Sequence, residues 1–473
     1  MGVLYQILGT FMISTMGVNM GVVFAWPAFT ITLFQSQNTT LSRPMTDTEI
    51  SLLGSLSSIG ALISTPTAGY MLEKLGRKYC SVMNSLGLLL VWVILACTKN
   101  VETVLAAVFL SGIASSVFLV ATVYISEICQ DSIRGSMTAC NMISYGLGML
   151  LSYLLGGILE YHVMLYVGVT MGALGTCLLF VLKETPIHLM SKGKEKEAAE
   201  SLAFYRMWKL DSKELLEEIN NMKRALNPDL SDDTPEEEKL QPEMKSAEKL
   251  SLWQFIKKSK SSRRAFFVSL VVMTAAIFQG LIVVQMYAEP LFVEAVPTAS
   301  PSLCSVMLAV ATVVAGIVAA YLTDRLGRRP LMIYASLGSG ISCVLLGTQM
   351  QFHWGPSWVA AVFMYLFAIM YTCGAGTVPF VLLAELFLPE VKSLFSMVLV
   401  EYVWLCNFVI LFIFNPLLKA VGWGPVFYIF AIICFLSSSF CVFFLPETKG
   451  LDVEAIQVLF TSKRKSRSVR SVC

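Results

Sequence analysis

The chain has 473 residues, of which 56% are hydrophobic and only 14% charged, and its formal net charge is +2. Because soluble domains carry about 25% charged residues, this composition excludes a water-soluble globular protein. It predicts an all-α membrane protein, and we expect no nucleic-acid partner.

The first charged residue is Arg43, and the apolar stretch from Val3 to Phe34 is too long for a secretory signal, so we expect a retained span. A helix needs about 20 apolar residues to cross a bilayer, and its backbone must be hydrogen-bonded within the segment. The twelve spans that this rule predicts have approximate cores at 7–30, 50–72, 79–98, 103–125, 137–159, 163–182, 266–288, 303–322, 331–349, 357–380, 395–416 and 425–445.

Three charged motifs occur twice, in the same order, in the two halves of the chain. The second copies follow the first by 251, 258 and 263 residues. Such recurrence at nearly one offset indicates an internal duplication, and transporters are commonly built from repeats with the substrate site between them. We therefore predict two six-helix pseudo-symmetric bundles. The pairs are EKLGRKY at 73–79 with DRLGRRP at 324–330, Glu127 with Glu385, and Glu184 with Glu447.

The duplication predicts four regions along the chain. They are an N-terminal six-helix bundle at 1–182, a cytoplasmic linker at 183–265, a C-terminal six-helix bundle at 266–445 and a basic cytoplasmic tail at 446–473. Within the linker we expect short helices at 194–226. Its acidic part at 227–250 is rich in charge and poor in apolar residues, so we expect it to be disordered.

Lysine and arginine predict the orientation, because cytoplasmic loops carry an excess of them. The side of the membrane that holds both termini is rich in these residues, whereas the other side carries only Arg43, Lys99 and Lys419. Both termini are therefore predicted to be cytoplasmic. Asn38 then lies outside the cell in an Asn-Thr-Thr triplet, and it is a candidate glycosylation site.

The repeated charges are candidates for an inner gate. Under one interpretation the basic residues serve membrane topology alone, but topology does not require the repeated glutamates. We favour a lattice of Arg–carboxylate pairs that joins helix ends within and between the halves, because such pairs are geometrically specific. Gly76 and Gly327 permit the positive backbone angle that the corners need. The candidate inner-gate residues are Glu127, Arg134, Arg77, Glu184, Asp324, Arg328, Glu385, Lys392 and Glu447.

Together these motifs resemble the sugar porter family of the major facilitator superfamily, and within it the facilitated trehalose transporters of insects. The resemblance covers the whole chain and rests on LGRK, YISEICQDSIRG, ETPIHL, DRLGRR, GTVPFVLLAELF and PETKGLDVEAIQ. It implies the major facilitator fold, a central cavity, location in the plasma membrane and alternating access for a hexose or disaccharide.

The positions at which the family binds sugar match less well. Where the family has two Gln and an Asn on span 7, this chain has Ala276, Ile277 and Ile282, and Met142 replaces the Gln of span 5. Burying a sugar hydroxyl without a hydrogen-bond partner costs about 1–3 kcal/mol of free energy. Other polar side chains must therefore bind the sugar hydroxyls. The candidate substrate-binding residues are Gln279, Gln285, Asn141, Tyr145, Thr372, Phe380, Glu401 and Trp404. For the two Gln, the alternative is a hydrogen bond to a neighbouring helix.

Glu401 is an acid inside span 11, where insertion costs about 2.5–3.5 kcal/mol. Either it lies near the inner headgroups, or it faces the cavity with Trp404 and accepts a hydroxyl, holds a cation or carries a proton. Proton-coupled members of the family use an Asp in span 1, but residues 1–46 contain no acid and Asn19 cannot titrate. We therefore expect facilitative transport.

The expected function is transmembrane transport of a glucose- or trehalose-like sugar. The alternatives are a facilitator of a less polar or cationic solute and a transport-poor sugar sensor. The chain has no nucleophile–base set, phosphate loop or Cys/His cluster, so we expect neither an enzyme nor a cofactor or metal. The expected partners are the sugar and the lipid bilayer.

Overall fold

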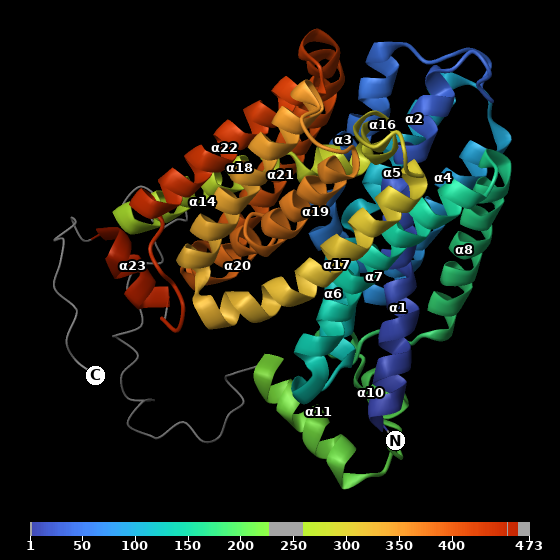
Figure 1. Ribbon diagram of the computed structural model, residues 1–473. Coiled ribbons are helices and arrows are strands. Elements are labelled where there is room, and N and C mark those ends of the chain that lie inside the picture. The colour runs from blue at the N-terminus through green and yellow to red at the C-terminus, as the bar shows by residue number, and fades with distance from the viewer. Residues whose placement is uncertain (1, 227–258, 452, 462–473) are drawn as a thin grey trace. The chain divides into compact units, whose positions relative to one another are not determined.

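The structure is a computed structural model that describes residues 2–226, 259–451 and 453–461 (Figure 1). All elements in this part of the chain are helices. The acidic linker stretch at 227–250 and the basic tail beyond residue 461 lie outside the described residues, so what the sequence predicts for them stays a prediction.

The first half of the chain forms eight α-helices in six spans, because two spans are interrupted. Pro27 starts a new helix within the first span, and a 3₁₀ turn at Ala114–Ser116 (η1) interrupts the fourth. The helices are α1 (Gly2–Ala25), α2 (Pro27–Gln35), α3 (Asp47–Leu75), α4 (Arg77–Cys97), α5 (Val101–Ile113), α6 (Val117–Ile128), α7 (Asp131–Ile158) and α8 (Tyr161–Val181).

The second half repeats this plan and also contains interrupted spans. Span 7 is divided among three helices and span 10 between two. The helices are α14 (Lys260–Phe278), α15 (Leu281–Met286), α16 (Ala288–Ala295), α17 (Pro301–Leu326), α18 (Arg328–Phe352), α19 (Trp358–Cys373), α20 (Val378–Glu385), α21 (Pro389–Val421), α22 (Trp423–Phe444) and α23 (Val453–Thr461).

Among the described residues, twelve helical segments are long and apolar enough to cross a membrane. This confirms the number of spans predicted from the sequence. Many of their large apolar side chains are exposed, for example Leu90 on α4 and Leu436 on α22. A helix that exposes apolar residues on its outer side suits hydrocarbon rather than water.

The described residues fall into two compact units. Unit 1 takes its residues from Met1–Ala247, Val283–Val310 and Leu411–Pro416, and unit 2 takes its residues from Glu248–Ile282, Ala311–Ile410 and Leu417–Cys473. The boundary between the units therefore runs through spans 7, 8 and 11. The four regions expected from the sequence stay a prediction.

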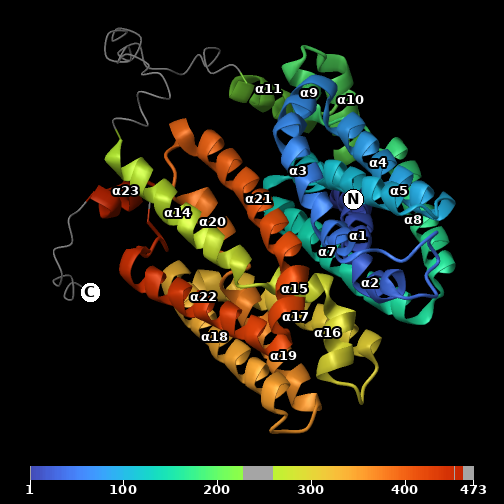
Figure 2. The same cartoon turned by 90° about the horizontal axis from the view of Figure 1, so that it is seen from above.

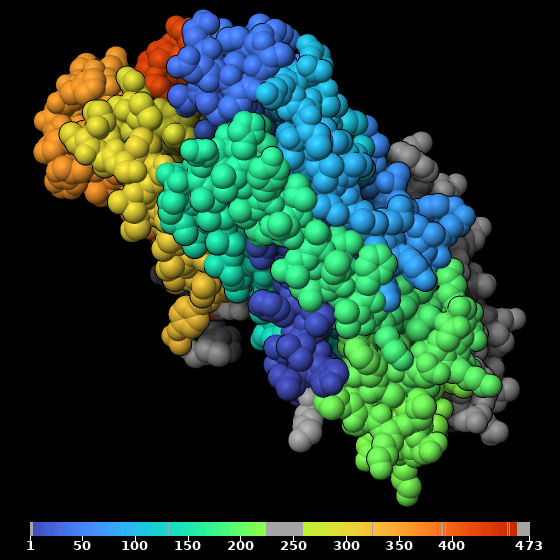
Figure 3. All heavy atoms as spheres, turned by 90° about the vertical axis from the view of Figure 1, so that its right-hand side faces the viewer, coloured from blue at the N-terminus to red at the C-terminus, as the bar shows by residue number. Residues whose placement is uncertain are grey.

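In unit 1, α1 lies along α7 and α8, and α4 lies along α8. The buried Trp92 of α4 donates from Nε1 to Oδ1 of Asn19 in α1 at 2.9 Å, which pairs two polar groups inside the bundle. Three linker helices, α9 (Pro186–Ser191), α10 (Glu195–Arg206) and α11 (Lys213–Leu226), share an apolar core that includes Leu202 and Leu215. Figure 3 shows them in light green at one end of the unit, beside the beginning of α1.

In unit 2, α18 lies along α22, and α14 contacts both α22 and α23 (Figure 2). Nη1 of Arg264 in α14 donates to the Phe460 carbonyl of α23 at 2.7 Å, and Nε2 of Gln457 in α23 donates to the Leu386 carbonyl at 2.6 Å. The short terminal helix is therefore attached to the end of the unit at which α18 begins.

Candidate functional site

The side chain of Arg77, the first residue of α4, binds the carboxylate of Glu127 at the end of α6. Nη2 and Nε of Arg77 lie 2.6 and 3.0 Å from Oε1 of Glu127. Nη1 donates to the Leu72 carbonyl at 3.1 Å and lies 2.9 Å from Nδ1 of His188. The two side chains of the ion pair are only 15% and 11% exposed, so water screens their attraction weakly.

The carboxylate of Glu184 closes the N-terminus of α4. It accepts the backbone N–H of Arg77 at 2.8 Å and that of Lys78 at 3.0 Å. These N–H groups have no acceptor within the helix, and they carry its positive dipole end. Gly76, which precedes them, has φ of 96°, and a Cβ there would touch the Glu184 carboxylate. The positive backbone angle predicted for Gly76 is confirmed.

Thr185 and His188 complete this group. Oγ1 of Thr185 donates to Oε2 of Glu127 at 2.6 Å, so each carboxylate oxygen of Glu127 has a partner. His188 is 6% exposed, and burial lowers the pKa of its imidazole below the ordinary value, an effect partly opposed by the Glu184 charge. A neutral ring suits its position beside the Arg77 guanidinium. We call Arg77, Glu127, Glu184, Thr185 and His188 the Arg77 cluster.

Unit 2 contains a second cluster built around Arg328, the first residue of α18. Nη2 and Nε of Arg328 lie 2.7 and 3.1 Å from Oε1 of Glu385 at the end of α20. The carboxylate of Glu447 accepts the backbone N–H of Arg328 at 3.0 Å, and Oγ1 of Thr448 donates to Oε2 of Glu385 at 2.7 Å. Gly327 has φ of 94°, which confirms its predicted positive angle. We call Arg328, Glu385, Glu447 and Thr448 the Arg328 cluster.

The two clusters share one design. In each, an Arg binds a Glu that ends one helix, while a second Glu covers the start of the helix on which the Arg lies. The adjacent Thr then supplies a hydroxyl to the first Glu. Each cluster therefore joins three helix ends within its own unit. The Arg–carboxylate pairs expected within the halves are present, and the role of these residues as a gate stays a prediction.

The remaining inner-gate candidates lie near these clusters in the sequence. Arg134, in the first turn of α7, and Lys392, in the first turn of α21, have exposed side chains. Asp324 lies in α17, but its side chain lies outside the part of the structure that is described. The predicted pairs between the halves stay predictions.

Span 7 is broken at two places. The first break follows α14 at Gln279 and Gly280, where Gly280 has φ of 92° and a Cβ would lie 2.6 Å from the Phe430 ring. Any other residue would therefore be strained at that position. The second break is at Tyr287, between α15 and α16. The boundary between the compact units crosses this span between Ile282 and Val283.

In unit 1, the second part of span 7 packs on spans of the first half. The hydroxyl of Tyr153 in α7 donates to the Gln285 carbonyl at 2.7 Å. The buried ring of Tyr287 lies 4.8 Å from that of Phe414, and a Cβ at Gly54 of α3 would lie 3.7 Å from the Tyr287 hydroxyl. We call the contacts of α15, α16 and residues 411–416 with α2, α3 and α7 the span-7 contact.

Residue Asn415 adds a polar bond to the span-7 contact. Its Nδ2 donates to the Asp47 carbonyl at the start of α3 at 2.9 Å. The contact is therefore closed by hydrogen bonds to backbone carbonyls and by aromatic packing.

Three predicted substrate-binding residues belong to unit 1. Asn141 of α7 is buried, its Nδ2 lies 3.5 Å from Oγ1 of Thr122, and its Oδ1 has no hydrogen-bond partner among the described residues. Tyr145, one turn later, packs its ring edge-on against Phe118 at 5.1 Å between centroids. Gln285 is half-buried, and its backbone is part of the span-7 contact. Asn141 and Tyr145 thus lie on one face of α7.

The other five candidates belong to unit 2. Gln279 is fully buried, and its Nε2 lies 3.4 Å from Oγ of Ser336 in α18. This contact agrees with the alternative expectation, in which Gln279 bonds a neighbouring helix instead of a sugar. Thr372 donates to the Ala368 carbonyl of its own helix at 2.7 Å. The side chains of Phe380 and Trp404 are exposed and half-buried, respectively.

Glu401 and Asn407 are polar residues within α21. Oε1 of Glu401 is buried and has no hydrogen-bond partner among the residues described. The same holds for Oδ1 of Asn407 and for Oε1 of Gln279. These three atoms all accept hydrogen bonds, so unit 2 has acceptors that a ligand rich in hydroxyl or ammonium groups could satisfy.

The reading of the sequence missed several polar contacts. Thr185 and Thr448 follow the repeated glutamates directly, so the recurrence of the Glu-Thr pair could have identified them. Tyr371, whose hydroxyl donates to the Ala276 carbonyl at 2.9 Å, and Tyr153 have no such signal, because their acceptors are backbone carbonyls. In the part of the chain that is described, no three His, Cys, Asp or Glu side chains lie close enough to hold a metal ion.

Residues 3–460 match the family model described as "Sugar (and other) transporter". The chain is 23% identical over 459 residues to the "Facilitated trehalose transporter Tret1" of Culex quinquefasciatus, which covers 96% of this chain and 85% of that protein. It is also 23% identical to the protein of the same name from Aedes aegypti, over 96% of this chain and 54% of that longer protein.

The fold is also found in solved structures. The "Inward open conformation of the xylose transporter XylE from E. coli" aligns with a TM-score of 0.76 at 19% sequence identity, over 95% of this chain and 98% of that chain. At this identity the likeness shows the fold, and it confirms the major facilitator architecture predicted from the sequence.

Proposed function

The chain belongs to the sugar transporter family, and from this premise we propose that it moves a hexose or disaccharide across the membrane by alternating access. A member of this family is a transporter rather than an enzyme. Membership of the family does not specify the solute, the mode of transport or the residues that take part. We therefore propose all three.

The observation that carries the proposal is the division of span 7. Its first part, α14, belongs to unit 2, whereas α15 from Val283 and α16 belong to unit 1. A helix whose parts belong to two compact bodies has to bend when those bodies move, and Gly280 gives the backbone freedom for that bend. Discontinuous spans of this kind line the substrate sites of transporters. The break at Gln279–Gly280, two residues before the boundary that follows Ile282, supports this mode of transport.

The polar groups support a sugar as the solute. A sugar carries many hydroxyl donors, and the acceptors Asn141 Oδ1, Gln279 Oε1 and Glu401 Oε1 have no partner among the described residues. A buried acceptor without a partner costs about 1–3 kcal/mol, so a hydroxyl that reaches it stabilises the bound state. The relatives named as trehalose transporters support the same class of solute.

We assign the two Arg clusters to the inner gate. Each joins helix ends by charge-assisted bonds within one unit, which keeps the ends rigid while the units move. With both termini in the cytoplasm of a plasma-membrane protein, Arg77 and Arg328 lie on the inner side, and the span-7 contact closes the outer side. Asn38 is exposed in the segment after α2, so it is accessible for the glycosylation predicted from its triplet.

Facilitative transport is supported by the environment of Asn19. Its Oδ1 accepts the Trp92 indole N–H at 2.9 Å inside the N-terminal bundle. The pair is neutral, so span 1 offers no proton carrier at that position. Transport then follows the sugar gradient alone, and its rate is unaffected by a proton gradient.

A second candidate function is favoured by Glu401. A buried carboxylate oxygen without a partner also suits a cationic solute, because an ammonium group supplies both donors and the opposite charge. Under this alternative the chain is a facilitator of a less polar or cationic solute. A transport-poor sensor is the third candidate, and it would bind sugar without flux.

A substrate panel in proteoliposomes separates the three. The purified chain is reconstituted, and uptake of labelled glucose, trehalose, xylose and a small organic amine is measured with and without a proton gradient. The proposal expects sugar uptake that saturates and that does not depend on the proton gradient. Amine uptake that is lost in Glu401→Gln would favour the second function. Thermal stabilisation by sugar without uptake would favour the sensor.

A further inference from the structure

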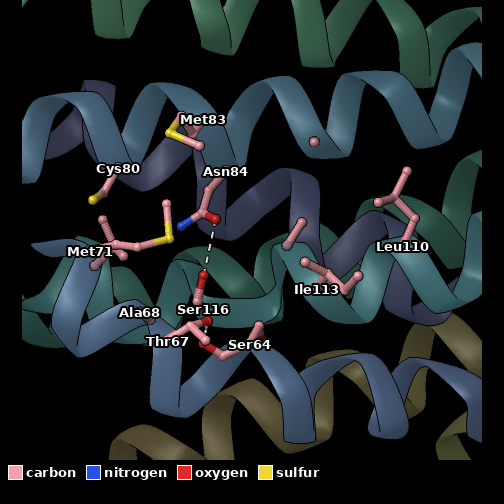
Figure 4. Close-up of a pocket in the computed structure, with 13 residues that line it drawn as sticks. Ser64, Thr67, Ala68, Met71, Cys80, Met83, Asn84, Leu110, Ile113 and Ser116 are labelled. Carbon is pink, nitrogen blue, oxygen red and sulfur yellow. Dashed lines mark hydrogen bonds between the residues drawn. The ribbon is translucent and has the colours of Figure 1, made fainter. Parts of the chain in front are cut away.

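The N-terminal bundle contains a cavity that none of the machinery above uses. It has a volume of about 160 Å³ and lies among α3, α4, α5, η1 and the beginning of α6 (Figure 4). Its walls are mostly apolar, with the thioethers of Met71 and Met83 and the thiol of Cys80 among them. No charged side chain lines it.

Local breaks in the helices make this cavity. Span 4 changes to a 3₁₀ turn at Ala114–Ser116, which tightens the backbone just where α5 would otherwise continue against α4. Gly87 of α4 faces the turn, and a Cβ there would lie 3.4 Å from Cβ of Ala114. Small side chains on both walls leave the space between the helices open.

The cavity contains one strong hydrogen-bond donor for a ligand. Oδ1 of Asn84 accepts the Ser116 hydroxyl at 3.0 Å. The hydroxyls of Ser64 and Thr67 donate to carbonyls of their own helix at 3.2 and 2.9 Å. The amide nitrogen of Asn84 is different, because no acceptor for it is found among the described residues. Figure 4 shows this nitrogen turned into the cavity, toward Met71.

The position of the cavity decides what can reach it. Asn84 is seven residues beyond Arg77 in α4, which is about 10 Å along the helix at 1.5 Å per residue. It therefore lies in hydrocarbon, deeper than the charges of the Arg77 cluster. Met83 and Ile113, which line the cavity, are 50% and 37% exposed, and the cavity is open rather than enclosed. A ligand can therefore enter it from the bilayer.

We propose that this cavity binds a small, uncharged, bilayer-soluble molecule that carries one carbonyl oxygen on an apolar body. The oxygen accepts the Asn84 amide, and the apolar body packs among Met71, Met83 and Ile113. A cavity of about this volume with apolar walls binds a molecule the size of benzene. The lack of charged walls excludes an ion, and an amide donor in hydrocarbon is most stabilised by an acceptor. The site is independent of the proposed sugar route.

Photolabelling tests the proposal with a matched pair of probes. One is a small alkyl diazirine that carries an acetyl group, and the other carries an ethyl group in its place. Each is added to proteoliposomes of the full chain and activated by light, and the labelled residues are identified by mass spectrometry. We expect the acetyl probe to label residues of α3, α4 and η1 around Asn84 about five-fold more than the ethyl probe, the worth of one neutral hydrogen bond.

Two variants test the site by different routes. Asn84→Leu removes the donor and should abolish the preference for the acetyl probe. Gly87→Leu fills the space and should remove labelling by both probes. Gly69→Leu is the matched control, because Gly69 lies in α3 outside the lining, a Cβ there meets nothing within 4 Å, and labelling should not change.

Three outcomes would overturn the proposal. Equal labelling by the two probes would show that the amide recognises nothing. Labelling spread evenly over the lipid-facing helices would show that the cavity holds lipid chains only. If the residues around the cavity are still labelled in Gly87→Leu, the probe does not occupy the space that the leucine fills.

Discussion

The guanidinium of Arg328 holds the carboxylate of Glu385, 57 residues further along the chain, through bonds of 2.7 and 3.1 Å to Oε1 and a bond of 3.2 Å from Nε to Oε2. In the other half, Arg77 holds Glu127 through bonds of 2.6 and 3.0 Å to Oε1. The Arg–Glu ion pair is thus repeated together with the sequence motif that contains it. Each copy fixes three helix ends within one unit.

Loss of either Arg should destabilise the protein strongly. In Arg328→Ala the Glu385 carboxylate, whose side chain is only 25% exposed, loses its charge partner, and breaking a mostly buried pair costs about 3 kcal/mol. Arg77→Ala should behave alike. The measurement is the unfolding temperature of the purified protein in detergent.

Arg43→Ala is the control for that experiment. Arg43 binds Glu49 and Glu102, but it is 44% exposed, and exposed pairs contribute about 0–1 kcal/mol. An unfolding temperature lowered equally in Arg43→Ala and Arg328→Ala would show that the Arg328 cluster has no special role.

The two threonine hydroxyls should both stabilise their clusters. Thr185→Val and Thr448→Val each remove a partly buried hydrogen bond to a carboxylate at nearly constant volume, and Thr185→Val also removes the bond of 3.4 Å that Oγ1 accepts from the His188 N–H at the start of α9. We expect a loss of about 1–2 kcal/mol of unfolding free energy in each. Thr170→Val, at an exposed hydroxyl that bonds only its own helix, should change little. If only one of the two cluster variants is destabilised, the clusters are not equivalent.

Acid should loosen the Arg77 cluster through His188. Burial lowers its pKa in the folded state relative to the unfolded chain. The unfolded chain therefore binds the proton first, and stability present above about pH 6.5 is lost as the pH falls through the folded pKa. The unfolding temperature of the wild type should fall more between pH 7.5 and pH 5.5 than that of His188→Gln.

His162→Gln is the matched control, because His162 is exposed on α8 and its loss should leave the pH dependence of the wild type intact. A His188→Gln protein with the same pH dependence as the wild type would contradict the assignment.

The bend in span 7 should be needed for transport. Gly280→Ala forces a side chain into the left-handed region, at about 1–2 kcal/mol, and against the Phe430 ring. We expect sugar flux to fall about ten-fold or more while binding of sugar persists, a difference of about 1.4 kcal/mol in the barrier. Gly316→Ala, at an open position in α17, is the control. Wild-type flux in Gly280→Ala would contradict a role of this bend.

The fold could be predicted from the sequence because its signals are long and repeated. Twelve apolar stretches determine the spans, and the recurring Gly-Arg and Glu residues predicted the positive angles of Gly76 and Gly327 as well as the pairing of Arg with Glu within each half. These features depend on residue types that have few alternatives in a membrane.

The polar interior was harder to predict. Gln279 was predicted to share a helix face with the sugar-binding positions of the family, yet its amide bonds to Ser336, directly before the break at Gly280. The span-7 contact depends on Tyr153 and Asn415, whose acceptors are backbone carbonyls without any sequence signature. The order of residues along a helix therefore does not predict which neighbour a polar side chain reaches once the helix is interrupted.

Counterflow in proteoliposomes tests the central claim most directly. Vesicles that contain the purified chain are loaded with unlabelled trehalose or glucose and diluted into a trace of the labelled sugar at equal pH on both sides. Alternating access by a sugar facilitator predicts a transient accumulation of label above its equilibrium level, without a proton gradient. A folded protein that gives no such overshoot with any sugar, and whose vesicles take up label no faster than empty ones, would contradict the account.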